Sequence, residues 1–213
     1  MKPKQGTTTS SVSSPCICLL GFKGAGKTTV GMALAELLGW SFVDADARIC
    51  DLHAQVFDEP GCRGSHSARS IHATHGARYF RSLEREALGS VVADISGKTA
   101  VLSLGGGALL QQRNRALLRR EQKAGRMVLV HIRCAKQEAY RRIMRQGIPA
   151  MLDARKPRQS FVALWHERMP AYERLADVTV WNRSTARRCA LRLRRDLDAK
   201  GITLLMEGSK RGV

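Results

Sequence analysis

The sequence predicts an α/β fold of three layers, in which a central parallel five-stranded sheet is covered by helices on both faces. Three observations lead to this prediction. Short apolar runs alternate with longer helical patterns along the chain, which is the order that a parallel sheet with crossover helices requires. The apolar runs are continuous, which is typical of strands buried on both faces. The length of 213 residues suits one domain with a full-sized core.

The expected elements follow each other in a regular order. Five apolar runs are the expected strands, at 16–20, 41–44, 99–104, 127–132 and 176–181. The expected helices span 29–38, 47–56, 77–95 with a helical pattern already present from 69, 111–124, 135–146, 160–175 and 184–199. The polar segments 58–67 and 147–159 contain Pro and Gly and are expected to be loops.

The two ends of the chain differ from the rest in composition. Residues 1–15 are polar and rich in Ser and Thr, which predicts a disordered leader, and residues 201–213 are expected to be a tail after a folded domain at 16–200. The leader has neither the apolar stretch of a secretory signal nor the arginines of a transit peptide. No apolar run reaches the ~18 residues of a membrane span. We therefore expect a cytoplasmic protein that makes no membrane contact.

The six cysteines indicate no disulfide framework, because no export signal accompanies them and a reducing compartment is expected. Cys50, His53, Cys62 and His66 do gather in one segment. Their spacing lacks the closely spaced ligand pairs of zinc sites, so no metal is expected there.

Residues 21–28, with the sequence GFKGAGKT, match the phosphate-binding pattern G-x-x-x-x-G-K-[ST]. An expected strand precedes them and an expected helix follows, as this motif requires. The loop backbone can direct its N–H groups at a phosphate, and the helix N-terminus adds positive charge. Lys27 is expected to reach the β- and γ-phosphates, and the Thr28 hydroxyl can bind Mg²⁺. The motif predicts nucleotide binding, although glycines also make simple tight turns.

Other candidate residues follow the expected strands at 41–44 and 99–104. Asp44 and Asp46 could bind a metal ion and orient an acceptor hydroxyl, but either could equally cap the next helix. The triple glycine at 105–107 could let the backbone approach a ligand, or could simply form a turn. Arg81 lies three residues before Glu84 and could be a surface ion pair or a guanidinium held for a substrate carboxylate, and Arg168 has the same two interpretations.

These motifs, in this order, resemble those of the shikimate kinase family, small P-loop enzymes with a fold like that of nucleoside monophosphate kinases. The resemblance runs from about residue 16 to 197. It is carried by the phosphate loop with Lys27, Thr28 and Thr29, and then by the sequences FVDAD at 42–46, GARYFRSLE at 76–84, LGGG at 104–107 and RMPAY at 168–172.

The resemblance implies ATP-dependent phosphorylation of shikimate to shikimate 3-phosphate, with Mg²⁺ as cofactor and with Lys27 and Asp46 as catalytic residues. It also implies that the kinase domain contains an acceptor-binding region at about 46–95 and a lid at about 147–159. The implied shikimate site consists of Asp46, Arg81, Gly105, Gly106, Gly107 and Arg168. The implied ATP site consists of Gly24, Ala25, Gly26, Lys27, Thr28, Thr29, Arg142, Asn182 and Arg183, and Thr28 and Asp44 would serve Mg²⁺. The two arginines would hold the shikimate carboxylate, and Asp46 would orient the attacking hydroxyl.

Two departures from the family pattern keep alternatives open. The family lid carries an arginine that reaches the transferring phosphate, and here Ile148 stands at that position. Arg145, Arg155 or Arg158 could replace it, or the acceptor could be another hydroxy acid such as gluconate, or the chain could bind nucleotide without turnover. The stretch 58–67 is expected to be an insertion near the acceptor site.

The net charge of +18 raises a third possibility, a nucleotide-dependent nucleic-acid-binding protein. An aromatic content of 5% leaves few side chains for base stacking and argues against single-strand binding. The arginines of the expected last helix alternate with leucines, as on a solvated amphipathic face. We therefore expect a small-molecule acceptor, no nucleic-acid partner and a monomer.

Overall fold

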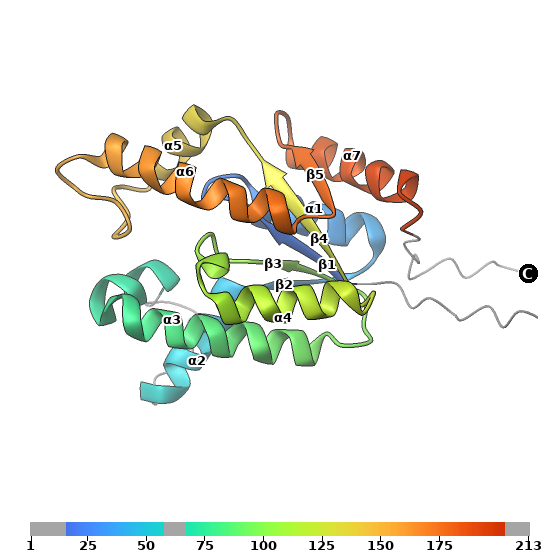
Figure 1. Cartoon of the computed structure of the whole chain (residues 1–213), viewed down its shortest axis with the longest axis horizontal. Helices are drawn as coiled ribbons and strands as arrows, with labels where there is room; N and C mark the ends of the chain where they lie inside the picture. Colours follow the sequence, from blue (N-terminus) through green and yellow to red (C-terminus); the bar gives the residue numbers. More distant parts are fainter. Residues whose placement is uncertain (1–15, 58–66, 203–213) are drawn as a thin grey trace, which may run out of the picture.

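The computed structural model describes residues 16–57 and 67–202 (Figure 1). The strands are β1 (Cys16–Leu20), β2 (Ser41–Asp44), β3 (Ala100–Ser103), β4 (Met127–Arg133) and β5 (Val178–Trp181). The helices are α1 (Lys27–Leu38), α2 (Ala45–Phe57), α3 (Ala68–Asp94), α4 (Gln112–Lys123), α5 (Lys136–Met144), α6 (Pro157–Leu175) and α7 (Ala186–Ala199), and a 3₁₀ turn, η1, spans Ala108–Leu110.

The five strands form one parallel sheet in the order β2-β3-β1-β4-β5, which confirms the predicted fold class. β1 pairs with β3 on one side and with β4 on the other. The chain leaves β1 towards β2 and leaves β3 towards β4, so adjacent strands send their connections in opposite directions. Such a switch opens a crevice beyond the carboxyl ends of the strands. The loops at 21–26 and 104–107 lie at this crevice.

Two hydrophobic clusters support the crevice. The larger one contains β1, β3 and β4, whose side chains are almost entirely buried because α1 and α7 cover one face while α4 and α6 cover the other. The smaller cluster joins α2 and α3 through Ile49, Ile71 and Phe80. The acceptor-side helices therefore have a small apolar core of their own next to the sheet.

Several boundaries differ from the predictions. The expected helix at 77–95 and the helical pattern from 69 form the two arms of α3, which meet in a kink at Gly76, where the backbone is not helical (φ 78°, ψ 171°). Ser67 begins α3 by accepting a hydrogen bond from the Ser70 N–H, which is the usual work of an N-cap serine. α6 begins earlier than expected, at Pro157, because proline is well suited to the first turn of a helix.

Some expectations fall outside the described residues: the leader at 1–15, the insertion at 58–66 and most of the tail at 203–213. Cys62 and His66 lie there too. The cysteines at 16, 18, 50, 134 and 189 are buried. Within 16–57 and 67–202 no helix has the length and apolar character to cross a membrane. In the same residues no three His, Cys, Asp or Glu side chains gather as metal ligands.

Candidate active site

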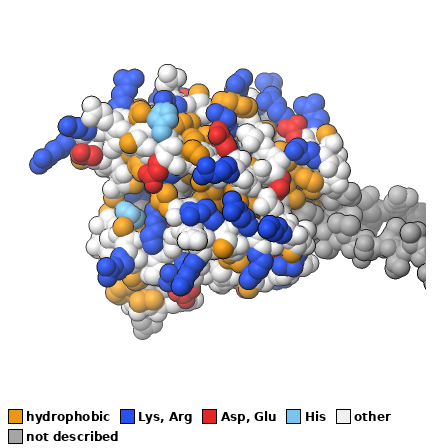
Figure 2. Space-filling view, viewed as in Figure 1, with side chains coloured by type: hydrophobic (Ala, Val, Ile, Leu, Met, Phe, Trp, Pro, Cys, Tyr) orange, Lys and Arg blue, Asp and Glu red, His pale blue; other side chains and the backbone are white. Residues whose placement is uncertain are grey.

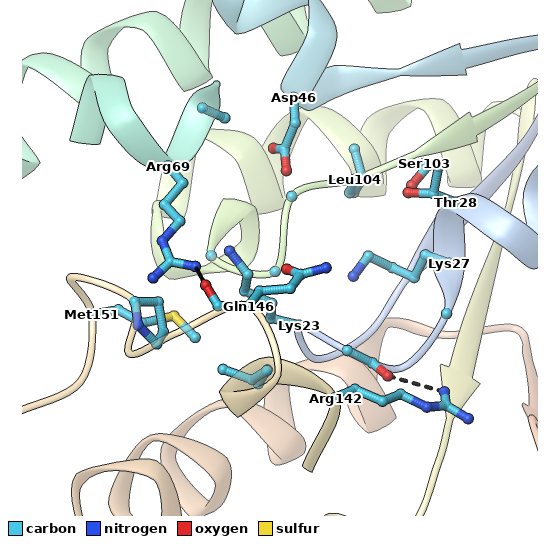
Figure 3. Close-up of a pocket in the computed structure, with 18 of the residues that line it drawn as sticks. Lys23, Lys27, Thr28, Asp46, Arg69, Ser103, Leu104, Arg142, Gln146 and Met151 are labelled. Carbon is cyan, nitrogen blue, oxygen red and sulfur yellow. Dashed lines mark hydrogen bonds between the residues drawn. The ribbon is translucent and has the colours of Figure 1, made fainter. Parts of the chain in front are cut away.

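A cavity of about 760 Å³ occupies the crevice beyond the strand ends (Figure 3). Its wall is made by the phosphate loop, the starts of α1, α2 and α3, the glycines at 105–107, the end of α5 and the residues that follow it. Arg168 of α6 and Asn182 after β5 complete the lining. The cavity therefore brings together elements from the whole length of the described chain.

The phosphate loop depends on two glycines with left-handed backbone conformations. Gly24 has φ of 80° and Gly26 has φ of 92°, a region that other residues rarely adopt. A Cβ atom on Gly24 would lie 2.9 Å from the Ala139 carbonyl oxygen, and one on Gly26 would collide with the Asn182 amide nitrogen. The loop can therefore curl against α5 and Asn182 only with glycine at these positions.

Lys27, the first residue of α1, is buried at the floor of the cavity. Its Nζ donates hydrogen bonds to the carbonyl oxygens of Gly21 at 2.9 Å and Phe22 at 3.2 Å. Burial lowers the pKa of Lys27, whereas the nearby Asp46 and Asp44 raise it. The ammonium group is thus held by its own loop, with two carboxylates close by, and it faces the space where a phosphate would enter.

Asp44 caps a helix, which is one of the two roles that the sequence left open for it, and it also contacts the phosphate loop. Its Oδ1 accepts a hydrogen bond from the Asp46 N–H at 2.9 Å, which caps α2. Its Oδ2 accepts a hydrogen bond from the Thr28 hydroxyl at 3.0 Å, which joins the helix cap to the phosphate loop. The hydroxyl and the carboxylate offer oxygen ligands of the kind that Mg²⁺ prefers, and both residues line the cavity.

Asp46, in the first turn of α2, points into the cavity from the other side (Figure 3). Burial is the main cause that raises its pKa, the nearby Asp44 raises it further, and Lys27 and Lys23 lower it. The Asp46 carboxylate packs on Gly105, where a Cβ atom would lie 2.6 Å from Asp46 Oδ1. The loop after β3 therefore needs glycine at position 105 in order to leave room for the Asp46 carboxylate.

Arg81 is held on the acceptor side by a buried carboxylate. Its Nη1 lies 2.5 Å from Glu84 Oε2, and Glu84 is only 4% exposed. Gln111 Nε2 donates to the same carboxylate oxygen at 3.1 Å and to the Arg81 carbonyl at 2.9 Å. A Cβ atom on Gly107 would lie 2.6 Å from Arg81 Nη1. This arrangement is a guanidinium fixed in place at a cavity wall, and not a mobile surface ion pair.

Arg168 lies in α6 with 5% exposure and forms no ion pair with a carboxylate of the described residues. Its Nη1 donates to the Gly106 carbonyl at 3.3 Å, and the Tyr172 hydroxyl donates to the same oxygen at 2.5 Å. Its Nε is buried without a hydrogen-bond partner in the described structure. Burial lowers the pKa of Arg168. An uncompensated buried cation at the cavity wall is suited to an anionic ligand.

On the side where the base of a nucleotide is expected, Asn182 Nδ2 donates to the Ala25 carbonyl at 2.9 Å and Arg142 Nη1 donates to the Gly24 carbonyl at 3.1 Å. Arg142 is oriented by Glu138, whose carboxylate lies 2.7 Å from Arg142 Nε. Arg183 is different, because it stacks over Trp181 at 4.3 Å and does not line the cavity.

The structure also adds cavity residues that the sequence did not indicate. Lys23 and Arg69 line the cavity, and burial lowers the pKa of Lys23 while the nearby Asp46 raises it. Ile148 is 40% exposed and does not line the cavity. Of the three arginines considered as its replacement, Arg145 lines the cavity, and Arg155 and Arg158 do not. Lys23 could have been noticed inside the phosphate motif, whereas no sequence signal marks Arg69.

Comparison with known proteins identifies the family of this chain. The family model described as shikimate kinase matches residues 23–198. A shikimate kinase of Thermobifida fusca is 37% identical over 79% of this chain and 86% of its own length, and one of Salinispora arenicola is 37% identical over 78% and 87%. The solved structure of a shikimate kinase from Acinetobacter baumannii in complex with shikimate is 29% identical, with a TM-score of 0.73 over 89% of this chain and 96% of that chain. The chain belongs to the shikimate kinase family.

Proposed function

We propose that the protein transfers the γ-phosphoryl group of ATP to a hydroxyl group of shikimate, which yields shikimate 3-phosphate and ADP. One observation carries the proposal: a single cavity has the phosphate loop on one side and two fixed arginines with a buried carboxylate on the other. A phosphate donor and a hydroxylated carboxylic acid fit these two sides. Membership of the family and the relative with bound shikimate support the same acceptor.

The phosphate side has the parts that phosphoryl transfer needs. The N–H groups of residues 24–29 and the Lys27 ammonium would bind the β- and γ-phosphates. Thr28 and Asp44 would hold Mg²⁺, which neutralises charge on the phosphates when it is bound. Arg142, Asn182 and Arg183 would contact the adenosine end, and the contacts of Arg142 and Asn182 with the loop backbone support this.

The residues of the acceptor side would have different roles. Arg81 and Arg168 would hold the carboxylate, because guanidinium forks bind carboxylates with directional, charge-assisted hydrogen bonds. The backbone at 105–107 would contact the ring, and Asp46 would orient the attacking hydroxyl and accept its proton. The pKa of Asp46 is raised by burial, which makes its carboxylate a better base than an exposed aspartate. The Lys27 ammonium, with Lys23 close by, would stabilise the negative charge on the γ-phosphoryl group.

The proposal includes the regions expected from the sequence: a domain at 16–200, an acceptor-binding region at about 46–95 and a lid at about 147–159. A monomer in the cytoplasm suits an enzyme of small metabolites. A kinase of a different hydroxy acid is the second candidate, because Ile148 stands at the lid position where the family carries an arginine. Figure 2 shows Lys and Arg over much of the viewed face, among acidic and hydrophobic side chains, and not as one stripe for a nucleic acid.

The test is an assay of ADP release with Mg-ATP and either shikimate, quinate, gluconate or no acceptor. We expect strong stimulation by shikimate alone, and detection of shikimate 3-phosphate by mass spectrometry. Stimulation by gluconate or quinate in place of shikimate would refute the acceptor. ADP release that no acceptor stimulates would refute acceptor phosphorylation altogether.

A further inference from the structure

A bidentate contact joins the acceptor side of the cavity to the start of the proposed lid. Arg69 is the second residue of α3. Its Nη1 donates to the Gln146 carbonyl at 2.5 Å, and its Nη2 donates to the Ile148 carbonyl at 2.7 Å. Figure 3 shows the Arg69 side chain extending from α3 to the Gln146 carbonyl. Seventy-seven positions of sequence separate the first pair of residues, so the contact is a tertiary one.

The chain at 145–148 is shaped to receive a cation. α5 ends at Met144, and the N–H groups of Gln146 and Gly147 donate back to the carbonyls of Ile143 and Met144. Among the described residues, the carbonyls of Gln146 and Ile148 accept no backbone hydrogen bond. They lie just beyond the C-terminus of α5, where the partial charge is negative and favours a cation. Gly147 has φ of 79°, and a Cβ atom there would lie 3.5 Å from Arg69 Nη2.

The contact connects two parts of the cavity wall that would otherwise be independent. Towards the nucleotide side, α5 packs on the phosphate loop, because Arg142 donates to the Gly24 carbonyl. Towards the acceptor side, the chain continues to Met151, whose sulfur lies 3.8 Å from Arg168 Nη1. α3 itself carries Arg81. Arg69 thus attaches the turn that precedes the lid to α3, the helix that would bind the acceptor.

We propose that Arg69 is a positioning residue that clamps the hinge of the lid, residues 146–148, to α3. The proposal rests on the proposed function for its effect on turnover, but the clamp itself is a property of the unliganded chain. The planar guanidinium spans two carbonyl oxygens, whereas an ammonium group cannot match this fork. The exposed Ile148 contributes its carbonyl oxygen, so a side chain from α3 anchors the lid through its backbone.

The first experiment measures the hinge without any substrate. The full chain and its Arg69→Ala, Arg69→Lys and Arg85→Ala variants are digested briefly with trypsin, and the early cleavage sites are identified by mass spectrometry. Arg85 is the matched control, because it is exposed on the same helix. We expect cleavage after Arg145 and Arg155 to accelerate ~10-fold or more in Arg69→Ala and less in Arg69→Lys, with an unchanged melting temperature. An unchanged rate at these sites, or equal acceleration throughout the chain, overturns the proposal.

The second experiment adds kinetics and a partner variant. Loss of two hydrogen bonds from a charged donor should lower kcat/KM for shikimate by ~10- to 100-fold in Arg69→Ala, with Arg85→Ala as the control. Gly147→Ala should impair the same hinge, and its effect should shrink in the Arg69→Ala background if both act on one contact. Fully additive effects overturn the clamp. If the wild type does not phosphorylate shikimate while the digestion result holds, the proposed function fails and the clamp stands.

Discussion

The two sides of the cavity are built in different ways. The phosphate side is one continuous loop, in which glycines set the backbone and Lys27 donates to carbonyls of the same loop. The acceptor side is assembled from α2, α3 and α6, and its three charged side chains meet on three successive glycines. Asp46 packs on Gly105, Arg168 donates to the Gly106 carbonyl, and Arg81 packs on Gly107.

This difference predicts how substitutions should affect each side. A local loop keeps its shape when one of its side chains is removed, so a substitution there should affect chemistry more than architecture. The acceptor side depends on close approach between distant elements, and the glycines at 105–107 let three helices reach one short stretch of backbone. Changes there should alter the recognition of the acceptor before they alter the binding of ATP.

The largest expected effect is on the phosphate side. Lys27→Met should lower kcat by at least ~10³-fold, because a preorganised positive charge at the transferring group is lost. The melting temperature should change little, because the two hydrogen bonds of Lys27 are local and burial of its charge is costly. Turnover is measured by ADP release and stability by thermal unfolding. The exposed Lys98→Met serves as the control, and wild-type turnover in Lys27→Met would contradict the mechanism.

A smaller and more selective effect is expected on the acceptor side. Arg81→Ala and Arg168→Ala should each raise the KM for shikimate by ~10- to 100-fold and change the KM for ATP much less, since a hydrogen bond to a charged group is worth ~1.5–3 kcal/mol. Steady-state kinetics with both substrates measures the split. The methyl ester of shikimate is the matched probe, because it lacks the carboxylate charge. If the variants lose as much with the ester as with shikimate, the two arginines do not bind the carboxylate.

The same contrast explains what the sequence could predict. The phosphate loop is contiguous, so its pattern and flanking elements predicted its location, and the strands were predicted because apolar runs mark a sheet buried on both faces. The acceptor residues were proposed from short motifs whose order resembled a family, and no single one was decisive. For Asp44 the sequence offered metal binding or helix capping as alternatives, and one carboxylate caps α2 while it also contacts Thr28.

Other features could not be predicted because they depend on tertiary contacts. The backbone of Gly76 is not helical and separates two arms of α3, and a glycine within a helical pattern does not reveal in advance whether the helix ends or kinks there. Arg69 is one of many arginines, and only the fold brings it to carbonyls at 146 and 148. The resemblance placed Arg183 near the nucleotide, and the sequence did not indicate that its side chain stacks on Trp181.

The smallest expected effect concerns Lys23, which belongs to the phosphate loop but faces the acceptor side. Its ammonium is one of the charges that lower the pKa of Asp46, whereas burial and Asp44 raise that pKa above the ordinary value of 3.8. Because Asp46 must be ionised to accept a proton, kcat/KM should fall as the pH drops through this raised pKa. Lys23→Met removes one lowering charge, so this acidic limb should move to higher pH, with a loss in kcat of ~10-fold or less.

The measurement is a pH profile of kcat/KM for shikimate in the wild type, Lys23→Met and Lys98→Met. The contribution of Asp46 to the stability of the fold should change with pH in the opposite direction to its contribution to activity. An aspartate whose folded-state pKa is raised contributes stability below its unfolded-state pKa and loses it as the pH rises through the folded-state pKa. As the pH rises through the folded-state pKa of Asp46, the free energy of unfolding should therefore fall while kcat/KM rises. Denaturant unfolding at several pH values measures the first change. If the acidic limb of Lys23→Met stays at the pH of the wild type, the charge of Lys23 does not influence the pKa of Asp46. The phosphate side and the acceptor side would then not be coupled through these two residues.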